Sequence, residues 1–195
     1  TAGASRPGGA IKRKIGKVGV LGAGMMGRGI AYSAATAGIE VVLKDISIEA
    51  AEKGKSYSAT VLDKEVGRGK RTVESREQVL ARITATDDMS LLADCDLIVE
   101  AVFEDVELKQ SIVREAEAVL KPDAIVATNT STLPISMLAD ASARPDRFIG
   151  LHFFSPVAKM HTVHISTGKK TSPETPAAAF HLAPQIRQPP NTSNA

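Results

Sequence analysis

The stretch Val18-Gly19-Val20-Leu21-Gly22-Ala23-Gly24-Met25-Met26-Gly27 decides the fold of this chain. Its beginning is a compact apolar run, which is typical of a buried strand. Three glycines follow at the spacing G-x-G-x-x-G, namely Gly22, Gly24 and Gly27. Small and apolar residues then predict a helix over 30–37. A strand, a glycine turn and a helix in this order form the loop that cradles the pyrophosphate of a dinucleotide.

Each glycine has a separate task in such a loop. Gly22 permits the tight turn, Gly24 lets the main chain approach the pyrophosphate, and Gly27 lets the helix pack closely on the strand. The main-chain N–H groups at the start of the helix then face the phosphates. A glycine-rich turn without a ligand is the alternative interpretation.

An acidic residue follows the second predicted strand, 40–43. Asp45 stands 18 residues beyond Gly27. A carboxylate at this place accepts hydrogen bonds from the adenosine ribose hydroxyls and repels a 2′-phosphate. The sequence therefore predicts NAD rather than NADP as the cofactor, with the basic neighbour Lys44 acting against that preference.

Strands and helices alternate along the rest of the chain. Further strands are expected at 84–86, 96–102, 124–127 and 148–152, and within 157–165. Further helices are expected at 47–66, 105–120, 134–139 and 172–187. Ser47 can cap the first of these, and a capping-box spacing that starts at Ser75 predicts one more helix. This alternation predicts an α/β fold, a Rossmann-type, doubly wound and mainly parallel sheet. We expect a linker or tail at 1–16, the dinucleotide-binding domain at 17–187 and an irregular end at 188–195.

The composition excludes several classes of function. The net charge of +2 gives no support for binding to nucleic acid or to a membrane surface, and no apolar run approaches the ~20 residues of a membrane span. Cys95 is the single cysteine, so an intrachain disulfide is impossible and a reducing compartment is expected, namely the cytoplasm or, in a eukaryote, the mitochondrial matrix. No metal site is expected, because no His/Glu pair has zinc spacing.

Two segments with reactive side chains follow predicted strands. They are Asn129-Thr130-Ser131-Thr132 and His152-Phe153-Phe154-Ser155-Pro156. Ligands of open α/β sheets lie beyond the carboxyl ends of the strands, so both segments face the cofactor side. His152 is a candidate base for an alcohol proton, with a packed or capping histidine as the alternative. The remaining histidines are expected to be surface or structural residues: His161, His164 and His181.

Four segments in order carry a specific resemblance. They are 18–27, Glu100-Ala101-Val102-Phe103-Glu104, Asn129-Thr130-Ser131-Thr132 and His152-Phe153-Phe154-Ser155-Pro156. Together they resemble the NAD-binding domain of 3-hydroxyacyl-CoA dehydrogenases, and in particular the dehydrogenase part of the multifunctional fatty-acid oxidation complex α subunit. The resemblance extends over about residues 17–187.

The resemblance implies an activity and a set of site residues. The family oxidises (S)-3-hydroxyacyl-CoA to 3-oxoacyl-CoA with NAD in fatty-acid β-oxidation. His152 is similar to its catalytic base, and Ser131 to the serine that contacts the substrate and the nicotinamide. The cofactor contacts implied are Gly22, Gly24, Met25, Met26, Gly27, Asp45, Val102, Glu104, Lys109 and Ser131. Without the resemblance, the sequence favours an exposed helix start for Glu104 and Lys109. A loose match places Ser58 and Lys64 near the CoA.

The chain also departs from the family pattern. His164 stands where the family has a glutamate that orients the base and stabilises its protonated form, and Ser155 replaces a common asparagine. A neutral His164 could orient His152 but could not supply a negative charge. The sequence up to Ala195 contains neither the family's later substrate-binding motif nor the C-terminal helical domain through which the family forms dimers or multienzyme complexes. A catalytically impaired or truncated NAD-binding module is therefore the alternative function, and another β-hydroxyacid dehydrogenase is a third and weaker one.

Overall fold

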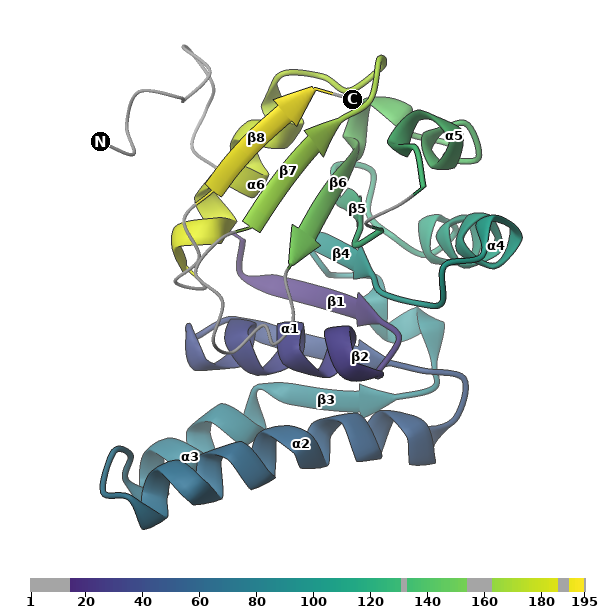
Figure 1. Cartoon of the computed structure of the whole chain (residues 1–195). Helices are drawn as coiled ribbons and strands as arrows, with labels where there is room; N and C mark the ends of the chain where they lie inside the picture. The colour runs from purple at the N-terminus through teal and green to yellow at the C-terminus, as the bar shows by residue number, and fades with distance from the viewer. Residues whose placement is uncertain (1–14, 131–132, 154–162, 186–189, 195) are drawn as a thin grey trace.

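A single twisted sheet organises the chain (Figure 1). The computed structural model describes residues 15–130, 133–153, 163–185 and 190–194, with side chains up to residue 179. The described strands have the order β3-β2-β1-β4-β5-β6-β7-β8. They are β1 (Lys17–Leu21), β2 (Glu40–Lys44), β3 (Ile83–Thr86), β4 (Leu97–Glu100), β5 (Ile125–Thr128), β6 (Phe148–Phe153), β7 (Val163–Thr167) and β8 (Pro190–Asn194). Strands β1 to β6 are parallel, whereas β7 is antiparallel to β6 and parallel to β8.

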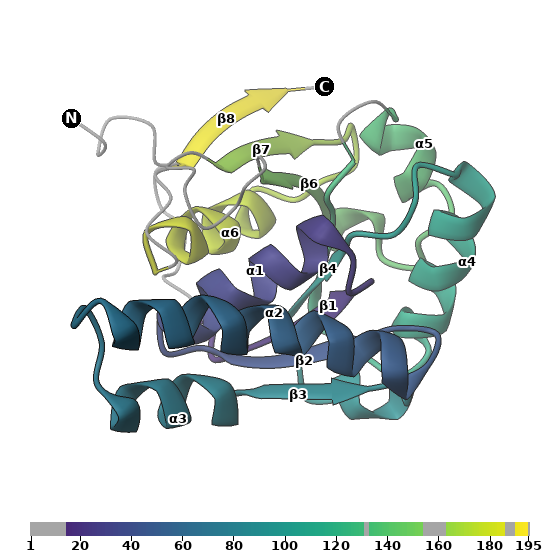
Figure 2. The same cartoon turned by 60° about the horizontal axis from the view of Figure 1, so that its bottom comes forward.

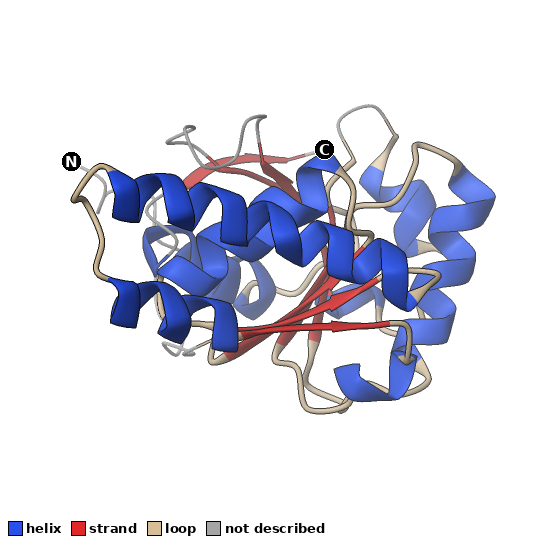
Figure 3. Cartoon of the chain, turned by 90° about the horizontal axis from the view of Figure 1, so that it is seen from below, coloured by secondary structure: helices blue, strands red, loops and turns tan. Residues whose placement is uncertain are grey.

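Helices cover both faces of this sheet (Figures 2 and 3). The α-helices are α1 (Met25–Thr36), α2 (Ile48–Gly67), α3 (Val73–Ala81), α4 (Val106–Glu117), α5 (Ile135–Ala139) and α6 (Glu174–Gln185), and the short 3₁₀ turns are η1 (Met89–Leu92) and η2 (Pro145–Arg147). Apolar residues of α1, α2, α3 and α6 share one core with the sheet, and those of α4, α5 and η1 share the other. The predicted doubly wound, mainly parallel α/β fold is confirmed.

Successive side chains of a strand point to opposite faces of the sheet and pack in different cores. In β4, Leu97 and Val99 pack on the side of α1, whereas Ile98 packs on the side of α4. Cys95 is buried in the second of these cores, and burial raises the pKa of its thiol to about 12. Cys95 is therefore a neutral, small packing residue.

The first residues of two helices can be compared with the predicted caps. The hydroxyl of Ser47 accepts a hydrogen bond from the N–H of Ala50 at 3.1 Å and caps α2, as expected. The expectation that Ser75 caps the next helix is wrong. Thr72 is the cap of α3, and its hydroxyl accepts a hydrogen bond from the N–H of Ser75 at 3.1 Å. Ser75 has a glutamine three positions later, as a capping box requires, whereas Thr72 has a serine there, so Thr72 caps α3 without a capping box.

The domain extends beyond both predicted limits. Ile15 is buried in the core, and the N–H of Gly16 donates to Asp96 at 2.8 Å, so these two residues do not belong to a linker. Residues 1–14 lie outside the described part of the chain. The predicted irregular end is also wrong for Pro190–Asn194, which form β8 beside β7. A proline is tolerated at the first residue of an edge strand, and pairing with β7 outweighs the low strand propensity of this polar segment.

The topology fixes where a ligand can bind. The chain proceeds from β1 outward to β2 and β3 and then returns to the other side of β1 to form β4. In such sheets the crevice beyond the carboxyl ends of β1 and β4 is the binding place for ligands. The strand ends are level there, because Leu21 pairs with both Lys44 and Glu100, and Glu100 pairs with Thr128.

Candidate active site

The turn between β1 and α1 has the shape of a phosphate-binding loop. Gly22 adopts a φ of +99°, a conformation that side chains other than glycine rarely accept. A Cβ on Gly27 would lie 1.7 Å from the carbonyl oxygen of Gly22, so α1 can start this close to β1 only with glycine there. A Cβ on Gly24 would meet no atom within 4 Å, which leaves the main chain of this residue open to approach.

The start of α1 suits an anionic group. Its N-cap is Gly24, which has no side chain to occupy the first N–H groups, and the first turn contains no acidic residue. The positive end of the helix dipole and these N–H groups therefore remain available to a pyrophosphate. Met25 and Met26 form the first turn, and Met25 is exposed. The free N–H groups at this helix start therefore fit the phosphates of NAD.

Asp45 lies at the end of β2, next to this loop. Its Oδ2 atom accepts a hydrogen bond from the N–H of Ala23 at 2.8 Å, and its Oδ1 atom accepts one from the N–H of Ile46 at 2.6 Å. The carboxylate is half-buried and fixed by main-chain donors. Asp45 thus stands beside the phosphate loop, as a ribose-binding acid must.

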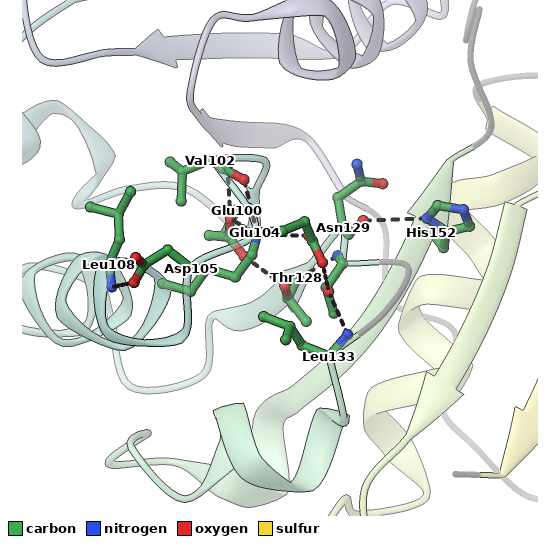
Figure 4. Close-up of polar contacts among 11 residues, drawn as sticks. Glu100, Val102, Glu104, Asp105, Leu108, Thr128, Asn129, Leu133 and His152 are labelled. Atoms are coloured by element: carbon green, nitrogen blue, oxygen red, sulfur yellow. Dashed lines mark hydrogen bonds and ion pairs between the residues drawn. The ribbon is translucent and has the colours of Figure 1, made fainter.

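A buried ion pair, which the sequence did not reveal, lies at the ends of β4 and β5 (Figure 4). Glu100 is fully buried, and its Oε1 atom accepts hydrogen bonds from Lys109 Nζ at 2.6 Å and from the N–H of Val102 at 2.8 Å. Its other oxygen accepts a hydrogen bond from the hydroxyl of Thr128 at 2.6 Å. A buried carboxylate with three donors is compensated, as burial of a charge requires.

The expectation of an exposed Lys109 is wrong, because its side chain is only 1% exposed. Its ammonium group also donates to the carbonyl oxygen of Val102 at 3.0 Å and lies 3.4 Å from Glu104, whose side chain is 41% exposed. Lys109 can be buried because its ammonium group is paired with the carboxylate of Glu100. Three positions implied as cofactor contacts, Val102, Glu104 and Lys109, are therefore neighbours in space.

Glu104 is also linked to the loop after β5. The hydroxyl of Thr130 donates to Glu104 at 2.6 Å and accepts a hydrogen bond from the N–H of Leu133 at 3.1 Å (Figure 4). Thr130 is thereby joined to Glu104, just before α4, and Leu133 is joined to Thr130. The predicted site residue Ser131 itself lies outside the described residues, as does Ser155.

His152 belongs to β6 and reaches the same edge of the sheet. It lies two residues beyond Gly150, which pairs with Thr128 at the end of β5. The Nδ1 atom of His152 is 3.3 Å from the main-chain oxygen of Asn129 (Figure 4). The side-chain oxygen of Asn129 accepts a hydrogen bond from the N–H of Phe153 at 2.9 Å. Asn129 thereby joins the loop after β5 to the end of β6.

The fold thus brings most predicted positions to one edge of the sheet. The glycine loop, Asp45, the Glu104–Lys109 pair and His152 all follow or end parallel strands at their carboxyl ends. The loose expectation for Ser58 is not supported, because its side chain is fully buried in α2. Lys64 is exposed in the last turn of the same helix.

The described residues contain no group of three or more His, Cys, Asp or Glu side chains placed to hold a metal ion. None of the helices in the described part of the chain is both long and apolar enough to cross a membrane.

A family model matches nearly the whole described domain. It is the model of "3-hydroxyacyl-CoA dehydrogenase, NAD binding domain", and it matches residues 17–193. The chain belongs to the 3-hydroxyacyl-CoA dehydrogenase family. The geometry of the glycine loop and Asp45 agrees with this assignment, and the cofactor of the domain is NAD.

Curated relatives of the family resemble the chain closely in sequence. The fatty acid oxidation complex subunit alpha of Psychrobacter arcticus is 40% identical over 181 residues, which cover 93% of this chain and 25% of the relative. That of Shewanella frigidimarina is 44% identical over 176 residues, which cover 90% of this chain and 25% of the relative. The chain therefore spans about a quarter of the length of these curated relatives.

Solved structures of the family share the fold. An (S)-3-hydroxybutyryl-CoA dehydrogenase from Ralstonia eutropha has a TM-score of 0.90 and 38% identity, over 93% of this chain and 64% of that one. The dehydrogenase part of multifunctional enzyme 1 from C. elegans has a TM-score of 0.84 and 29% identity, over 96% of this chain and 43% of that one.

His164 lies directly opposite His152, the candidate base, on the neighbouring strand. His152 and His164 are partners in the antiparallel pairing of β6 and β7. Cross-strand partners point to the same face of a sheet, with Cβ atoms roughly 4.5–5.5 Å apart. The side chain opposite His152 is therefore an imidazole and not an acid.

Proposed function

We propose that this chain oxidises the 3-hydroxyl group of an (S)-3-hydroxyacyl-CoA to a ketone with NAD, as a step of fatty-acid β-oxidation. The observation that supports this most is the position of His152. It reaches the carboxyl edge of the sheet from β6, on the same edge as the glycine loop of an NAD-binding domain. A group that takes a proton and a cofactor that takes a hydride are the two requirements of alcohol oxidation.

The chemistry divides between His152 and the cofactor. His152 removes the hydroxyl proton as the C3–H bond breaks and the carbonyl double bond forms, and the proton resides on the imidazole. When bound, NAD supplies the acceptor for the hydride from C3. Ser131, in the loop joined to Glu104 through Thr130, holds the substrate oxygen in this proposal.

The other site residues hold the cofactor. The main-chain N–H groups of the glycine loop bind the pyrophosphate, and Asp45 binds the adenosine ribose. Val102 and Glu104, in the loop before α4, and Lys109, in the first turn of α4, contact the cofactor, and Glu100 at the end of β4 fixes the lysine. The charge of Asp45 disfavours a 2′-phosphate, so NADP binds more weakly than NAD.

The acyl-CoA substrate and membership of a multienzyme complex come from the relatives. Their names describe subunits of a fatty acid oxidation complex, and the solved neighbour from Ralstonia eutropha is named a 3-hydroxybutyryl-CoA dehydrogenase. We propose the same class of substrate and of assembly for the protein to which this chain belongs.

The reverse reaction tests the proposal. The protein is mixed with acetoacetyl-CoA and NADH, and the loss of NADH absorbance is followed beside a His152→Gln variant. Turnover by the wild-type chain that the variant lacks supports the proposal. Equal rates for the two proteins overturn it.

The alternative is an NAD-binding module without turnover. Its basis is that His152 pairs with His164, which supplies no negative charge to stabilise the protonated base. Binding of NAD in a calorimetric titration, together with no turnover in the assay above, would select this alternative.

A further inference from the structure

Asn129 holds the end of β6 by two different groups. Its side-chain oxygen accepts the N–H of Phe153 at 2.9 Å, and its main-chain oxygen lies 3.3 Å from Nδ1 of His152. Its own N–H donates to the carbonyl oxygen of Glu100 at 2.8 Å. Asn129 is itself 9% exposed. The residue is thus fixed to β4 and in turn fixes two consecutive residues of β6.

The main-chain contact determines where the imidazole proton lies. A carbonyl oxygen can only accept a hydrogen bond, so Nδ1 of His152 must carry the proton in this pair. In a neutral imidazole the other nitrogen, Nε2, then holds the free lone pair. A base needs this lone pair, and the Nε2–H tautomer would present a proton instead.

We propose that Asn129 is a positioning residue that fixes His152 in the Nδ1–H tautomer. It takes over the orienting task that a glutamate performs in the family pattern, where this chain has His164. The proposal rests on the proposed function only in naming His152 as the base. A main-chain carbonyl accepts a hydrogen bond at every pH, whereas a histidine accepts one only in its neutral form and through one of its nitrogens.

The side chain of Asn129 makes the contact possible. The N–H of Phe153 is buried and pairs with the amide oxygen across 24 positions of sequence. Removing that oxygen leaves a buried N–H unsatisfied, and the end of β6 would move to relieve it. Such a movement carries His152 away from the main-chain oxygen of Asn129, so a side-chain substitution reports on a main-chain contact.

Nitrogen NMR of protein with ¹⁵N-labelled histidine tests the proposal. The two ring nitrogens differ in chemical shift according to which one carries the proton, and the His152 signals are those that disappear in His152→Gln. The wild-type protein, above the pH at which its histidines titrate, should show His152 as the Nδ1–H tautomer. A predominant Nε2–H tautomer in the wild type overturns the proposal without any variant.

Three variants complete the test. Asn129→Ala should produce a mixture of tautomers at His152, whereas Asn129→Asp keeps an acceptor oxygen and should preserve the wild-type tautomer. Thr171→Val is the matched control, because the hydroxyl of Thr171 donates to the carbonyl of Phe148 at the other end of β6, at 3.0 Å. A tautomer in Asn129→Ala that is the same as in the wild type, or a mixture in Thr171→Val, contradicts the proposal.

Turnover separates this proposal from the proposed function. If the chain is active, Asn129→Ala should lower kcat about tenfold and leave KM unchanged, since the change is confined to the position and tautomer of the base. Activity with His152 in the Nε2–H tautomer refutes the role of Asn129 and leaves the dehydrogenase function standing. An inactive protein with His152 in the Nδ1–H tautomer supports the role of Asn129 and refutes the dehydrogenase function.

Discussion

The ammonium group of Lys109 lies 2.6 Å from a carboxylate oxygen of Glu100, and both side chains are excluded from solvent. The pair joins the end of β4 to the first turns of α4, on either side of the loop that carries Val102 and Glu104. A segment proposed to contact the cofactor is thereby attached to the rigid sheet. Buried ion pairs of this kind fix geometry more than they add stability.

Removing one partner of this pair should destabilise the fold. Lys109→Met leaves Glu100 as a buried carboxylate without its cation, which costs about 3–5 kcal/mol of unfolding free energy. Lys17→Met is the control, because its pair with the exposed Asp94 should contribute less than about 1 kcal/mol. Urea denaturation measures both. Equal losses in the two variants would show that the buried pair has no special role.

The two glycines of the phosphate loop should respond differently to alanine. Gly27→Ala forces a Cβ into the carbonyl oxygen of Gly22 and should prevent the native packing of α1 on β1. Gly24→Ala meets no neighbouring atom and has an extended main chain that alanine accepts, so it should fold normally. Its methyl group instead occupies the approach of the pyrophosphate. Circular dichroism and NAD calorimetry separate the two effects, and wild-type NAD affinity in a folded Gly24→Ala would argue against this position of the phosphates.

Asp96 should make part of the stability dependent on pH in acid. Burial raises the pKa of its carboxyl group, but hydrogen bonds from Lys121 and from the N–H groups of Gly16 and Lys17 outweigh this effect and lower the pKa below its usual value. In the unfolded chain an aspartate carboxyl group has a pKa of about 3.9. The stabilisation is therefore present above about pH 4 and is lost as the pH falls through the lower folded pKa.

Thermal unfolding at a series of acidic pH values checks this dependence. Asp96→Asn removes the carboxylate and should unfold at a lower temperature than the wild type near neutral pH, with a smaller further loss in acid. The same slope of melting temperature against pH in both proteins would mean that Asp96 is not one of the responsible groups.

Placing an acid at position 164 should increase the turnover proposed for this chain. His164→Glu places a carboxylate opposite His152 and stabilises its protonated form. Because the main chain of Asn129 already accepts from Nδ1, the gain comes from the charge alone and should be on the order of tenfold in kcat. His164→Gln adds a polar group without charge and should give no gain. Equal kcat values for the Glu and Gln variants would remove the charge from the explanation.

The fold could be predicted from the sequence to a large extent, because its signals are local. The run before Gly22, the glycine spacing and Asp45 together specify the first β-α-β unit, and the later alternation specifies the parallel sheet. The end of the chain could not be predicted in this way. Pro190–Asn194 have no strand pattern of their own and become β8 through pairing with β7.

The site could be predicted less completely, because its contacts join distant segments. The resemblance implies roles for His152 and Lys109, but the burial of Lys109 depends on Glu100 in β4, whose other oxygen bonds to Thr128 in β5. An acidic residue ending an apolar strand was the one available signal for Glu100. Nothing local marks Asn129 as the partner of His152, since 23 positions separate them.

Transfer of deuterium tests the proposed hydride transfer most directly. The protein is incubated with NAD and (S)-3-hydroxybutyryl-CoA deuterated at C3, and the NADH formed is analysed by mass spectrometry beside the His152→Gln variant. We predict deuterated NADH from the wild-type chain with the (S) substrate, and none with the (R) substrate or with the variant. No deuterated NADH above the level of the variant would contradict the assignment of this chain as a working dehydrogenase.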